Sequence, residues 1–432
     1  MRTEGQGKTV VLGLGYIGLP TAALIARSGG QVVGVDVNAD VVETINAGRI
    51  HIEEADLDGL VQAMVHRGLL RATTQVEAAD TFLIAVPTPL TADHRPDIGH
   101  VLDAARQIAP VLQPGNLIIL ESTSPVGTTA QMRDILAQLR PDLRWPGATD
   151  GPADIFIAYC PERVLPGRIL AELVGNDRCI GGITPRCARR AMRFYRRFVR
   201  GDCHTTSAAV GEMVKLVENS FRDVNIAFAN ELSMVAERLD VPVWEVIRLA
   251  NRHPRVQILQ PGPGVGGHCI AVDPWFLIDG APEDTPLIRT ARAVNHRKTA
   301  HVIARATRLI AGHPDALVGI FGLAFKPDID DFRESPALDI ALSLARDFGP
   351  RLHIVEPYAP GLPAAFDGTG ACLTDLDDAL GRCDLWILLV DHELFRSIPA
   401  SERGGKVIYD TRGIWGDQIR RVRAADVLRA EG

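Results

Sequence analysis

A single cysteine, Cys269, follows the glycine-rich segment 262–267, and these residue types together could perform covalent chemistry. Four of the six positions in that segment are glycine, which lets a backbone approach a ligand closely because it has no Cβ. A thiol held there can attack a carbonyl carbon and hold the substrate covalently. Asp273 follows four residues later. Taken alone, the segment also fits a glycine-rich turn with a buried structural cysteine.

A second glycine motif, Gly-x-Gly-x-x-Gly over residues 13–18, follows the apolar run 9–12. A helical pattern and a second apolar run come next, and that run ends at Asp36. This context predicts a dinucleotide site, with the pyrophosphate at the helix N-terminus. Asp36 lies where a carboxylate binds the adenosine ribose diol, and its charge repels a 2′-phosphate. We therefore expect NAD rather than NADP.

Composition excludes several classes of function. The chain has 432 residues and a net charge of −7, which predicts two to four domains and disfavours a nucleic-acid partner. No apolar run has the roughly 18 residues of a membrane helix, and residues 1–8 lack the apolar stretch of a secretion signal. Seven cysteines and twelve histidines show no disulfide or metal-ligand spacing. We expect a cytoplasmic protein with no metal.

The order of apolar patterns along the chain predicts the helices and strands that must position the cysteine and the dinucleotide motif. Alternating strands and helices up to about residue 200 predict a mostly parallel, doubly wound sheet. Thr88, Thr123 and Glu162 fall at carboxyl ends of its strands, where ligands bind. A second alternation begins near residue 316. The prediction is an α/β fold of two Rossmann-like doubly wound domains joined by a long central helix, with domains at 1–208, 209–315 and 316–432.

The connecting segment, from Ala209 to about Leu239, has apolar residues at helical spacing and no proline. Such a helix would be about 45 Å long, and apolar residues on more than one face suggest burial against another subunit. Lys215, Asn219 and Arg222 share one face of it. A lysine and an amide beside a nicotinamide can polarise an alcohol oxygen or orient a water, although a solvated face is the alternative.

Basic residues gather at four further places, and arginine forks bind phosphates in a bidentate way. The cluster 251–255 precedes the cysteine loop, Lys326 and Arg333 flank an acidic turn, and Arg412 follows the last strand. Solvated charge explains any one of them. Together they favour a diphosphate or carboxylate ligand.

These features suggest a mechanism. A primary alcohol gives a hydride to NAD and becomes an aldehyde, to which the Cys269 thiolate adds. A second hydride transfer, to a second NAD, converts the thiohemiacetal into a thioester, which water hydrolyses to a carboxylate. The thiol would hold the aldehyde while the cofactor is exchanged. This hypothesis explains why one chain needs both a dinucleotide site and a nucleophilic cysteine.

At these residues the sequence resembles the UDP-glucose/GDP-mannose dehydrogenase family over nearly the whole chain. The motifs that carry the resemblance stand in the family's order: Gly13-Leu-Gly-Tyr-Ile-Gly18, Val86-Pro-Thr-Pro89, Glu121-Ser-Thr-Ser-Pro-Val-Gly127, Cys160-Pro-Glu-Arg163, Lys215-Leu-Val-Glu-Asn219, Gly266-Gly-His-Cys269, Phe321-Gly-Leu-Ala-Phe-Lys326 and Arg333-Glu-Ser335. Segments 219–231, 251–255 and 261–276 are most similar to the branch that oxidises UDP-N-acetyl-D-mannosamine (UDP-ManNAc).

The resemblance implies oxidation of the sugar C6 hydroxymethyl group to a uronic acid for a surface polysaccharide, and a homodimer formed through the central helix. It implies Cys269 as nucleophile and Lys215 as acid/base, supported by Asn219, Glu162 and Asp273. NAD would contact Gly13, Gly15, Tyr16, Ile17, Gly18, Asp36, Thr88 and Thr123. The UDP-sugar would contact Arg163, Val164, Lys215, Asn219, Arg222, His253, Arg255, Gly266, Lys326, Arg333 and Arg412.

Alternatives remain at the level of sequence. A β-hydroxyacid dehydrogenase also places Lys-x-x-x-Asn on a helix, but it leaves Cys269 and the third domain unexplained. A non-enzymatic NAD-dependent protein would not need the thiol, and a zinc dehydrogenase lacks its ligand spacing here. Within the family, UDP-N-acetylglucosamine (UDP-GlcNAc) differs from the mannosamine only at C2, and no single residue decides between them.

Overall fold

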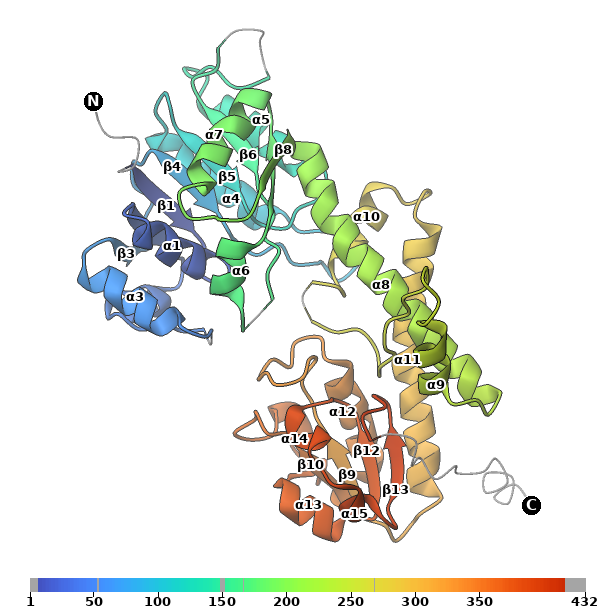
Figure 1. Ribbon diagram of the computed structural model, residues 1–432. Coiled ribbons are helices and arrows are strands. Elements are labelled where there is room, and N and C mark those ends of the chain that lie inside the picture. The colour runs from blue at the N-terminus through green and yellow to red at the C-terminus, as the bar shows by residue number, and fades with distance from the viewer. Residues whose placement is uncertain (1–6, 53, 148–151, 166, 268, 416–432) are drawn as a thin grey trace. The chain divides into compact units, whose positions relative to one another are not determined.

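The computed structural model describes residues 7–52, 54–147, 152–165, 167–267 and 269–415 (Figure 1). The chain forms two compact units, each described here by itself. The first contains residues 1–218 and 275–282, and the second contains residues 219–274 and 283–432. The three domains expected from the sequence stay a prediction.

The first unit is built on an eight-stranded sheet with the order β3-β2-β1-β4-β5-β6-β7-β8. All neighbours are parallel except β6 and β7, so the expected doubly wound sheet is confirmed and carries one antiparallel step. The strand order reverses between β1 and β4, which is where such sheets bind ligands. The strands are β1 (Lys8–Leu12), β2 (Gln31–Val35), β3 (Leu70–Thr73), β4 (Thr81–Ile84), β5 (Leu117–Leu120), β6 (Phe156–Tyr159), β7 (Arg178–Gly182) and β8 (Cys203–Ser207).

Helices cover both faces of this sheet, because its strands are apolar on both sides. Side chains of α1, α3 and α7 share one core cluster with Val11, and those of α4 and α5 share another with Val10 and Leu12. The helices are α1 (Gly18–Arg27), α2 (Ala39–Asn46), α3 (Leu57–His66), α4 (Gly99–Ile108), α5 (Thr128–Leu139), α6 (Ile169–Gly175) and α7 (Pro185–Tyr195).

The long helix expected from the apolar spacing is α8 (Ala208–Arg238), 31 residues long. After it come α9 (Val243–Ala250), α10 (Asp273–Gly280) and α11 (Pro286–Ala311). Helix α11 has 26 residues and was not predicted, because charged residues interrupt its apolar pattern. Asp273, expected in the cysteine loop, is the first residue of α10.

The second unit contains a five-stranded, fully parallel sheet with the order β11-β10-β9-β12-β13. This confirms the second Rossmann-like part, and its strand order reverses between β9 and β12. The strands are β9 (Val318–Phe321), β10 (Leu352–Val355), β11 (Cys372–Leu373), β12 (Leu385–Leu388) and β13 (Val407–Asp410). The helices are α12 (Pro336–Phe348), α13 (Leu376–Arg382), α14 (Glu393–Arg396) and α15 (Ala400–Arg403).

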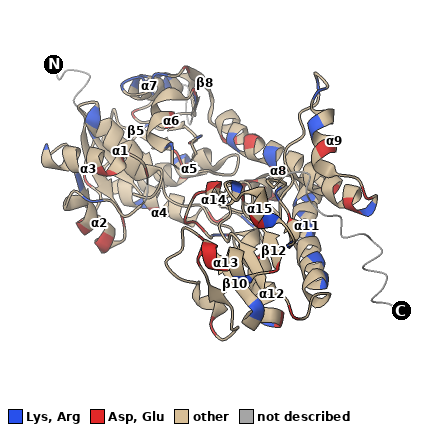
Figure 2. Ribbon diagram, turned by 60° about the horizontal axis from the view of Figure 1, so that its bottom comes forward, with Lys and Arg blue, Asp and Glu red and all other residues tan. Residues whose placement is uncertain are grey.

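Charged side chains of both signs are spread over the two units. Acidic residues stand out on α2 and α13, and basic residues on α7 and α11 (Figure 2). Within the residues that the structure describes, no helix combines the length and the apolarity that a bilayer crossing requires.

Candidate active site

The turn between β1 and α1 holds the predicted dinucleotide motif. Gly13 has a φ of 85°, and its N–H donates to the carbonyl of Val35 at 2.8 Å. One Asp36 carboxylate oxygen accepts the Leu14 N–H, and the other accepts the Asn38 N–H, each at 3.0 Å. The carboxylate expected to bind ribose is thus fixed in place at the end of β2, next to the turn.

The second and third glycines of this motif serve different purposes. A Cβ added to Gly18 would lie 1.8 Å from the carbonyl oxygen of Gly13, so Gly18 is needed for the turn to pack on itself. A Cβ added to Gly15 would meet nothing within 4 Å. The space over Gly15 is therefore open to a ligand, and the residues of the turn fit a dinucleotide whose pyrophosphate lies there.

We expect Gly15→Ala and Gly18→Ala to separate these two purposes. Gly15→Ala should leave the melting temperature nearly unchanged and raise the dissociation constant for NAD about tenfold or more, because the methyl group fills ligand space. Gly18→Ala should lower both stability and affinity, since its methyl group collides with main chain. Thermal unfolding with and without NAD measures both effects. Equal losses of stability in the two variants would contradict this division of roles.

Two further predicted cofactor residues lie at neighbouring strand ends. Thr88 follows β4 and Thr123 follows β5, and the Thr88 hydroxyl donates to the Thr123 carbonyl at 2.6 Å. Tyr16 and Ile17 are half-buried at the start of α1. The structure thus brings the predicted cofactor residues to the carboxyl ends of β1, β2, β4 and β5, around the position where the strand order reverses.

Lys215 and Glu162 are in contact, but through the main chain of Glu162. The Lys215 ammonium donates to the Glu162 carbonyl oxygen at 2.6 Å. The Glu162 carboxylate is buried and accepts a hydrogen bond from Arg178 at 2.9 Å. Arg163, expected to bind substrate, pairs with Glu218 at 2.6 Å, and the neighbouring Val164 is half-buried.

A second buried acid, Glu121, lies in the same cluster as Glu162. It follows β5 and accepts a hydrogen bond from the Tyr195 hydroxyl at 2.5 Å. Burial raises the pKa of Glu121 to about 7; Arg178 opposes this shift and the charge of Glu162 adds to it. The buried thiol of Cys160 faces the same groups, and its pKa is raised by the same desolvation.

We expect Glu121→Gln to change how stability depends on pH. Because the folded-state pKa of Glu121 is about 7 and its ordinary value is 4.5, the folded wild type binds more protons between these limits. Wild-type stability should therefore fall relative to the variant as pH rises from 4.5 to 7, by up to about 3 kcal/mol, and the difference should be constant above that. Urea unfolding at a series of pH values measures it.

Glu77 provides a control of opposite sign. Hydrogen bonds from Arg71 and Lys8 lower the pKa of Glu77 to about 2. Its stabilising contribution is present above its ordinary value of 4.5 and is lost as pH falls through 2. Glu77→Gln should lose stability relative to wild type as pH rises. If Glu121→Gln shows the same sign as Glu77→Gln, Glu121 is ionised in the folded protein and its expected shift is wrong.

The cysteine loop is anchored to the first turn of α10. The main-chain N–H of Asp273 donates to the Cys269 carbonyl at 2.8 Å. The side-chain amide of Asn219, on α8, donates to the Asp273 carboxylate at 2.5 Å, and both side chains are buried. The structure therefore links three of the predicted catalytic residues within the second unit. His268, part of the motif, lies outside the described residues.

The glycines before Cys269 allow close packing of the loop against the second unit itself. A Cβ on Gly266 would lie 2.3 Å from the Glu334 carbonyl oxygen, and one on Gly267 would lie 2.7 Å from the Phe325 ring. A Cβ on Gly264 would lie 2.4 Å from the Thr299 hydroxyl. The sequence suggested close approach to a ligand, and the structure adds a close approach to protein.

A buried polar network supports the same loop from two helices. Asn230, on α8, accepts the Gly262 N–H at 2.9 Å and donates to Asn295, on α11, at 2.9 Å. Asn295 donates to the Asp223 carboxylate at 2.8 Å, which also pairs with Arg292 at 2.7 Å. Because all four side chains are buried and bonded, this network fixes the start of the loop.

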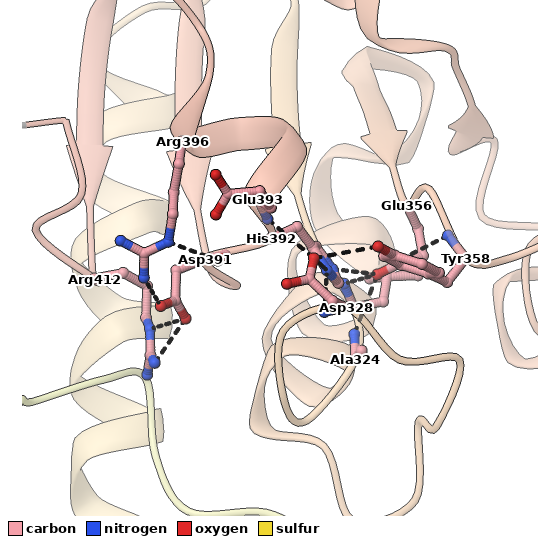
Figure 3. Close-up of polar contacts among 10 residues, drawn as sticks. Ala324, Asp328, Glu356, Tyr358, Asp391, His392, Glu393, Arg396 and Arg412 are labelled. Carbon is pink, nitrogen blue, oxygen red and sulfur yellow. Dashed lines mark hydrogen bonds and ion pairs between the residues drawn. The ribbon is translucent and has the colours of Figure 1, made fainter. Parts of the chain in front are cut away.

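The predicted substrate-binding basic residues have different surroundings. Arg412 is held by Asp391, which also binds Arg396 (Figure 3). Arg333 pairs with Asp331 and is exposed, as are Arg222, His253 and Arg255, whereas Lys326 is half-buried. Arg412 and Asp391 line a small pocket with Gly264, Ala324, Phe325 and Val390.

This pocket lies at the carboxyl ends of β9 and β12, at the reversal of strand order in the second sheet. Two nitrogens of the Arg412 guanidinium are bonded to Asp391, so the side chain has a fixed orientation beside this pocket.

Sequence reasoning missed the buried polar residues that hold the site together. Arg178, Asn230, Asn295 and Asp391 bind no predicted ligand directly, so no motif pointed to them. A polar residue within an apolar helical stripe, such as Asn230 in α8, was the available signal.

A Rossmann-like sheet with an NAD-type glycine turn, a second parallel sheet and a glycine-rich cysteine loop are typical of dehydrogenases that act on nucleotide-linked substrates. Family models of the UDP-glucose/GDP-mannose dehydrogenase family match its NAD binding domain at residues 7–199, its central domain at 209–297 and its UDP binding domain at 319–417. The chain belongs to this family. NAD is its cofactor, and a UDP-sugar is its substrate.

Individual relatives are similar over almost their whole length. An NDP-N-acetyl-D-galactosaminuronic acid dehydrogenase from Ralstonia nicotianae is 54% identical, over 94% of this chain and 95% of its own. A UDP-N-acetyl-D-mannosamine dehydrogenase from Escherichia coli K12 is 52% identical, over 94% and 98%. The solved structure of a UDP-D-ManNAc dehydrogenase from Pyrococcus horikoshii matches with a TM-score of 0.85 at 38% identity, over 96% of this chain and 97% of that one.

Proposed function

We propose that this chain oxidises the C6 hydroxymethyl group of UDP-ManNAc to a carboxylate in two steps, with two molecules of NAD. The observation that carries the proposal is the position of Cys269, whose main-chain carbonyl is bonded to Asp273 beside Asn219, in the same unit as the UDP binding domain. A simple alcohol dehydrogenase has no use for a nucleophile in that position, whereas a four-electron oxidation needs one.

In the first oxidation, Lys215 and Asn219 act on the substrate oxygen. NAD bound at the turn 13–18 would accept a hydride in each of the two oxidations. The Lys215 ammonium stabilises negative charge that develops on the C6 oxygen, and the hydroxyl proton passes to solvent through it or through a bound water. The side-chain amide of Asn219 donates to Asp273, which fixes its orientation.

In the second stage, the Cys269 thiolate adds to C6 of the aldehyde and the aldehyde oxygen takes a proton. Loss of a hydride from C6, together with the proton of its hydroxyl group, gives a thioester, and water then displaces the thiol to leave the carboxylate. The substrate stays attached between the two oxidations, so the reactive aldehyde is not released. Asp273, fixed beside the loop, is the carboxylate that we expect to orient the water.

The choice of sugar rests on the relatives. Two relatives with nearly equal sequence identity to this chain carry different sugars in their names: UDP-N-acetyl-D-mannosamine in one and NDP-N-acetyl-D-galactosaminuronic acid in the other. Both sugars carry a 2-acetamido group, and we infer a 2-acetamido hexose as the substrate, with UDP-ManNAc first. The 2-epimer, UDP-GlcNAc, is the alternative.

The test is the amount of NADH formed per mole of limiting UDP-sugar. We expect two NADH from UDP-ManNAc and much slower reactions of UDP-GlcNAc, UDP-N-acetylgalactosamine and UDP-glucose at equal concentration. Mass spectrometry of the product should show the uronic acid. Two NADH from another of these sugars would change the substrate but keep the reaction, and one NADH from every sugar would reject the four-electron oxidation.

We infer further that the chain forms a homodimer through α8. Three large apolar side chains on this helix recur at seven-residue spacing and are exposed. They are Phe221, Phe228 and Val235, which are 67%, 56% and 47% exposed. Such spacing places them on one face of the helix, where a second copy of the chain would bury them. The three domains 1–208, 209–315 and 316–432 are part of the same proposal.

Phe228→Glu should shift the protein from twice the chain mass to the chain mass in light scattering, because a carboxylate on this face must be desolvated in the dimer. Val241→Glu, at another exposed apolar site outside α8, serves as the control and should leave the mass unchanged. A dimer that persists in Phe228→Glu would place the interface elsewhere.

A further inference from the structure

The guanidinium of Arg178 is buried inside the first unit, although no motif gives it a role. Arg178 begins β7 and is 2% exposed. One of its terminal nitrogens donates to the Glu162 carboxylate at 2.9 Å, and the other donates to the Leu173 carbonyl at 3.0 Å. An arginine fork bound to two acceptors on different elements has a single orientation, so Arg178 is a rigid anchor for the Glu162 side chain.

Glu162 is held on two sides. One carboxylate oxygen accepts from Arg178, and the other accepts the N–H of Arg163 at 2.6 Å. The main-chain carbonyl of the same residue accepts from the Lys215 ammonium at 2.6 Å. Because the carboxylate is fixed to Arg178, the peptide that follows it cannot rotate freely, and the carbonyl oxygen stays directed to Lys215.

We propose that Arg178 is the positioning residue for Lys215. It holds the Glu162 carboxylate in the interior of the domain and thereby presents the Glu162 carbonyl to the lysine ammonium. This inference rests on the proposed function, in which Lys215 acts on the substrate oxygen. A lysine side chain has four rotatable bonds, and displacement of a reacting group by about 1 Å costs up to about 100-fold in rate.

The same geometry gives Glu162 a second role. The sequence motif predicts a catalytic carboxylate, and that carboxylate is 7% exposed and accepts from Arg178 and from the Arg163 N–H. The main-chain carbonyl of the same residue also holds the Lys215 ammonium. Loss of Arg178 therefore disturbs both groups, and the accessibility of Lys215 reports the second one separately.

Tyr195 provides a matched control within the same buried cluster. Its ring lies 5.5 Å from the Arg178 guanidinium carbon, and its hydroxyl donates to Glu121. Tyr195→Phe removes a hydrogen bond from the cluster while the pair of Arg178 and Glu162 remains. Loss of rate through general damage to the cluster would appear in this variant as well.

The experiment compares Arg178→Met, Arg178→Lys and Tyr195→Phe in steady-state NADH formation from UDP-ManNAc. Arg178→Met should lower kcat about 100-fold with the KM values of both substrates within about threefold. Arg178→Lys should fall between Arg178→Met and wild type, because lysine keeps the buried charge but lacks the planar fork that reaches both acceptors. Tyr195→Phe should remain near wild type.

Full activity in the Arg178 variants would overturn the proposal, as would a loss in Tyr195→Phe equal to that in Arg178→Met. If Arg178→Met does not fold, Arg178→Lys decides, since it keeps the buried charge. If the wild-type protein oxidised none of the UDP-sugars, the proposed function itself would be rejected.

A readout independent of activity keeps the two failures apart. Peptide mass spectrometry after pulse labelling with an amine-reactive ester reports how accessible the Lys215 ammonium is. We expect labelling of Lys215 to be several-fold faster in folded Arg178→Met or Arg178→Lys and unchanged in Tyr195→Phe, because only the former lose the directed carbonyl. Unchanged labelling in the Arg178 variants would overturn the positioning role whatever the substrate is.

Discussion

Cys269→Ala is expected to abolish formation of the uronic acid, with a loss of at least about 1,000-fold in its rate. Without the thiol, the aldehyde has no covalent attachment, and the second hydride can leave only from a hydrate formed in water. The first oxidation does not use the thiol, so the variant should still produce one NADH for each substrate molecule that it oxidises to the aldehyde. Rapid-quench analysis of products and NADH over the first turnovers measures both stages.

Cys372→Ala is the matched control, since this thiol belongs to the same unit and is exposed. It should retain wild-type rates. Retention of two NADH per substrate by Cys269→Ala would mean that the chain oxidises an aldehyde hydrate directly and that Cys269 is structural, which was the alternative interpretation of its glycine-rich segment.

Lys215→Met should lower kcat by about 100- to 10,000-fold in both oxidations. Methionine retains the length of the side chain but has no charge to stabilise the developing oxyanion. Steady-state kinetics with UDP-ManNAc, and with the aldehyde as substrate for the second oxidation, would measure both losses.

Lys406 offers a control of the same chemical kind. Its ammonium also donates to a main-chain carbonyl, that of Cys383, at 2.9 Å, in the second sheet. Lys406→Met loses the same type of hydrogen bond, so it should affect stability and leave kcat unchanged. A loss of kcat in Lys406→Met equal to that in Lys215→Met would show that the rate reports overall stability and that Lys215 has no special role.

Local patterns explain what the sequence predicted well. The strand, turn, helix and acid from Lys8 to Asp36 lie within a short stretch, and their glycines act on neighbouring main chain. The long helix α8 was evident because its apolar residues recur over many turns. In these places, the interactions that determine structure are close in sequence, so periodicity and spacing describe them.

Polar pairs between residues far apart in the chain could not be predicted from the sequence. Arg292 reaches Asp223 from 69 residues away, and Lys215 reaches the Glu162 carbonyl from 53 residues away. No single-sequence pattern marks such pairs, because each partner alone resembles a surface charge. The same limit applies to Glu162, where the motif identifies the residue but cannot say whether its carboxylate or its carbonyl faces the lysine.

In both sheets, a carboxylate that follows the second strand accepts hydrogen bonds from the turn after the first strand. Asp36 bonds to the turn after β1, and Glu356 bonds to the amides of Leu323 and Ala324 after β9, at 2.6 and 3.2 Å. Glu356 also accepts from His392, which is buried (Figure 3). The carboxylate in the second sheet thus accepts from two amides of its turn, whereas Asp36 accepts from one amide of the first turn.

The open turn after β1 has a consequence for the order of events. A chain with two equivalent crevices could hold two cofactors together and oxidise its substrate without interruption. Among the described residues, the glycine turn with open space over Gly15 follows β1, so under the proposed two-step oxidation both molecules of NAD would bind there, one after the other. The interval between release of the first NADH and binding of the second NAD would then set how long the substrate stays attached to Cys269.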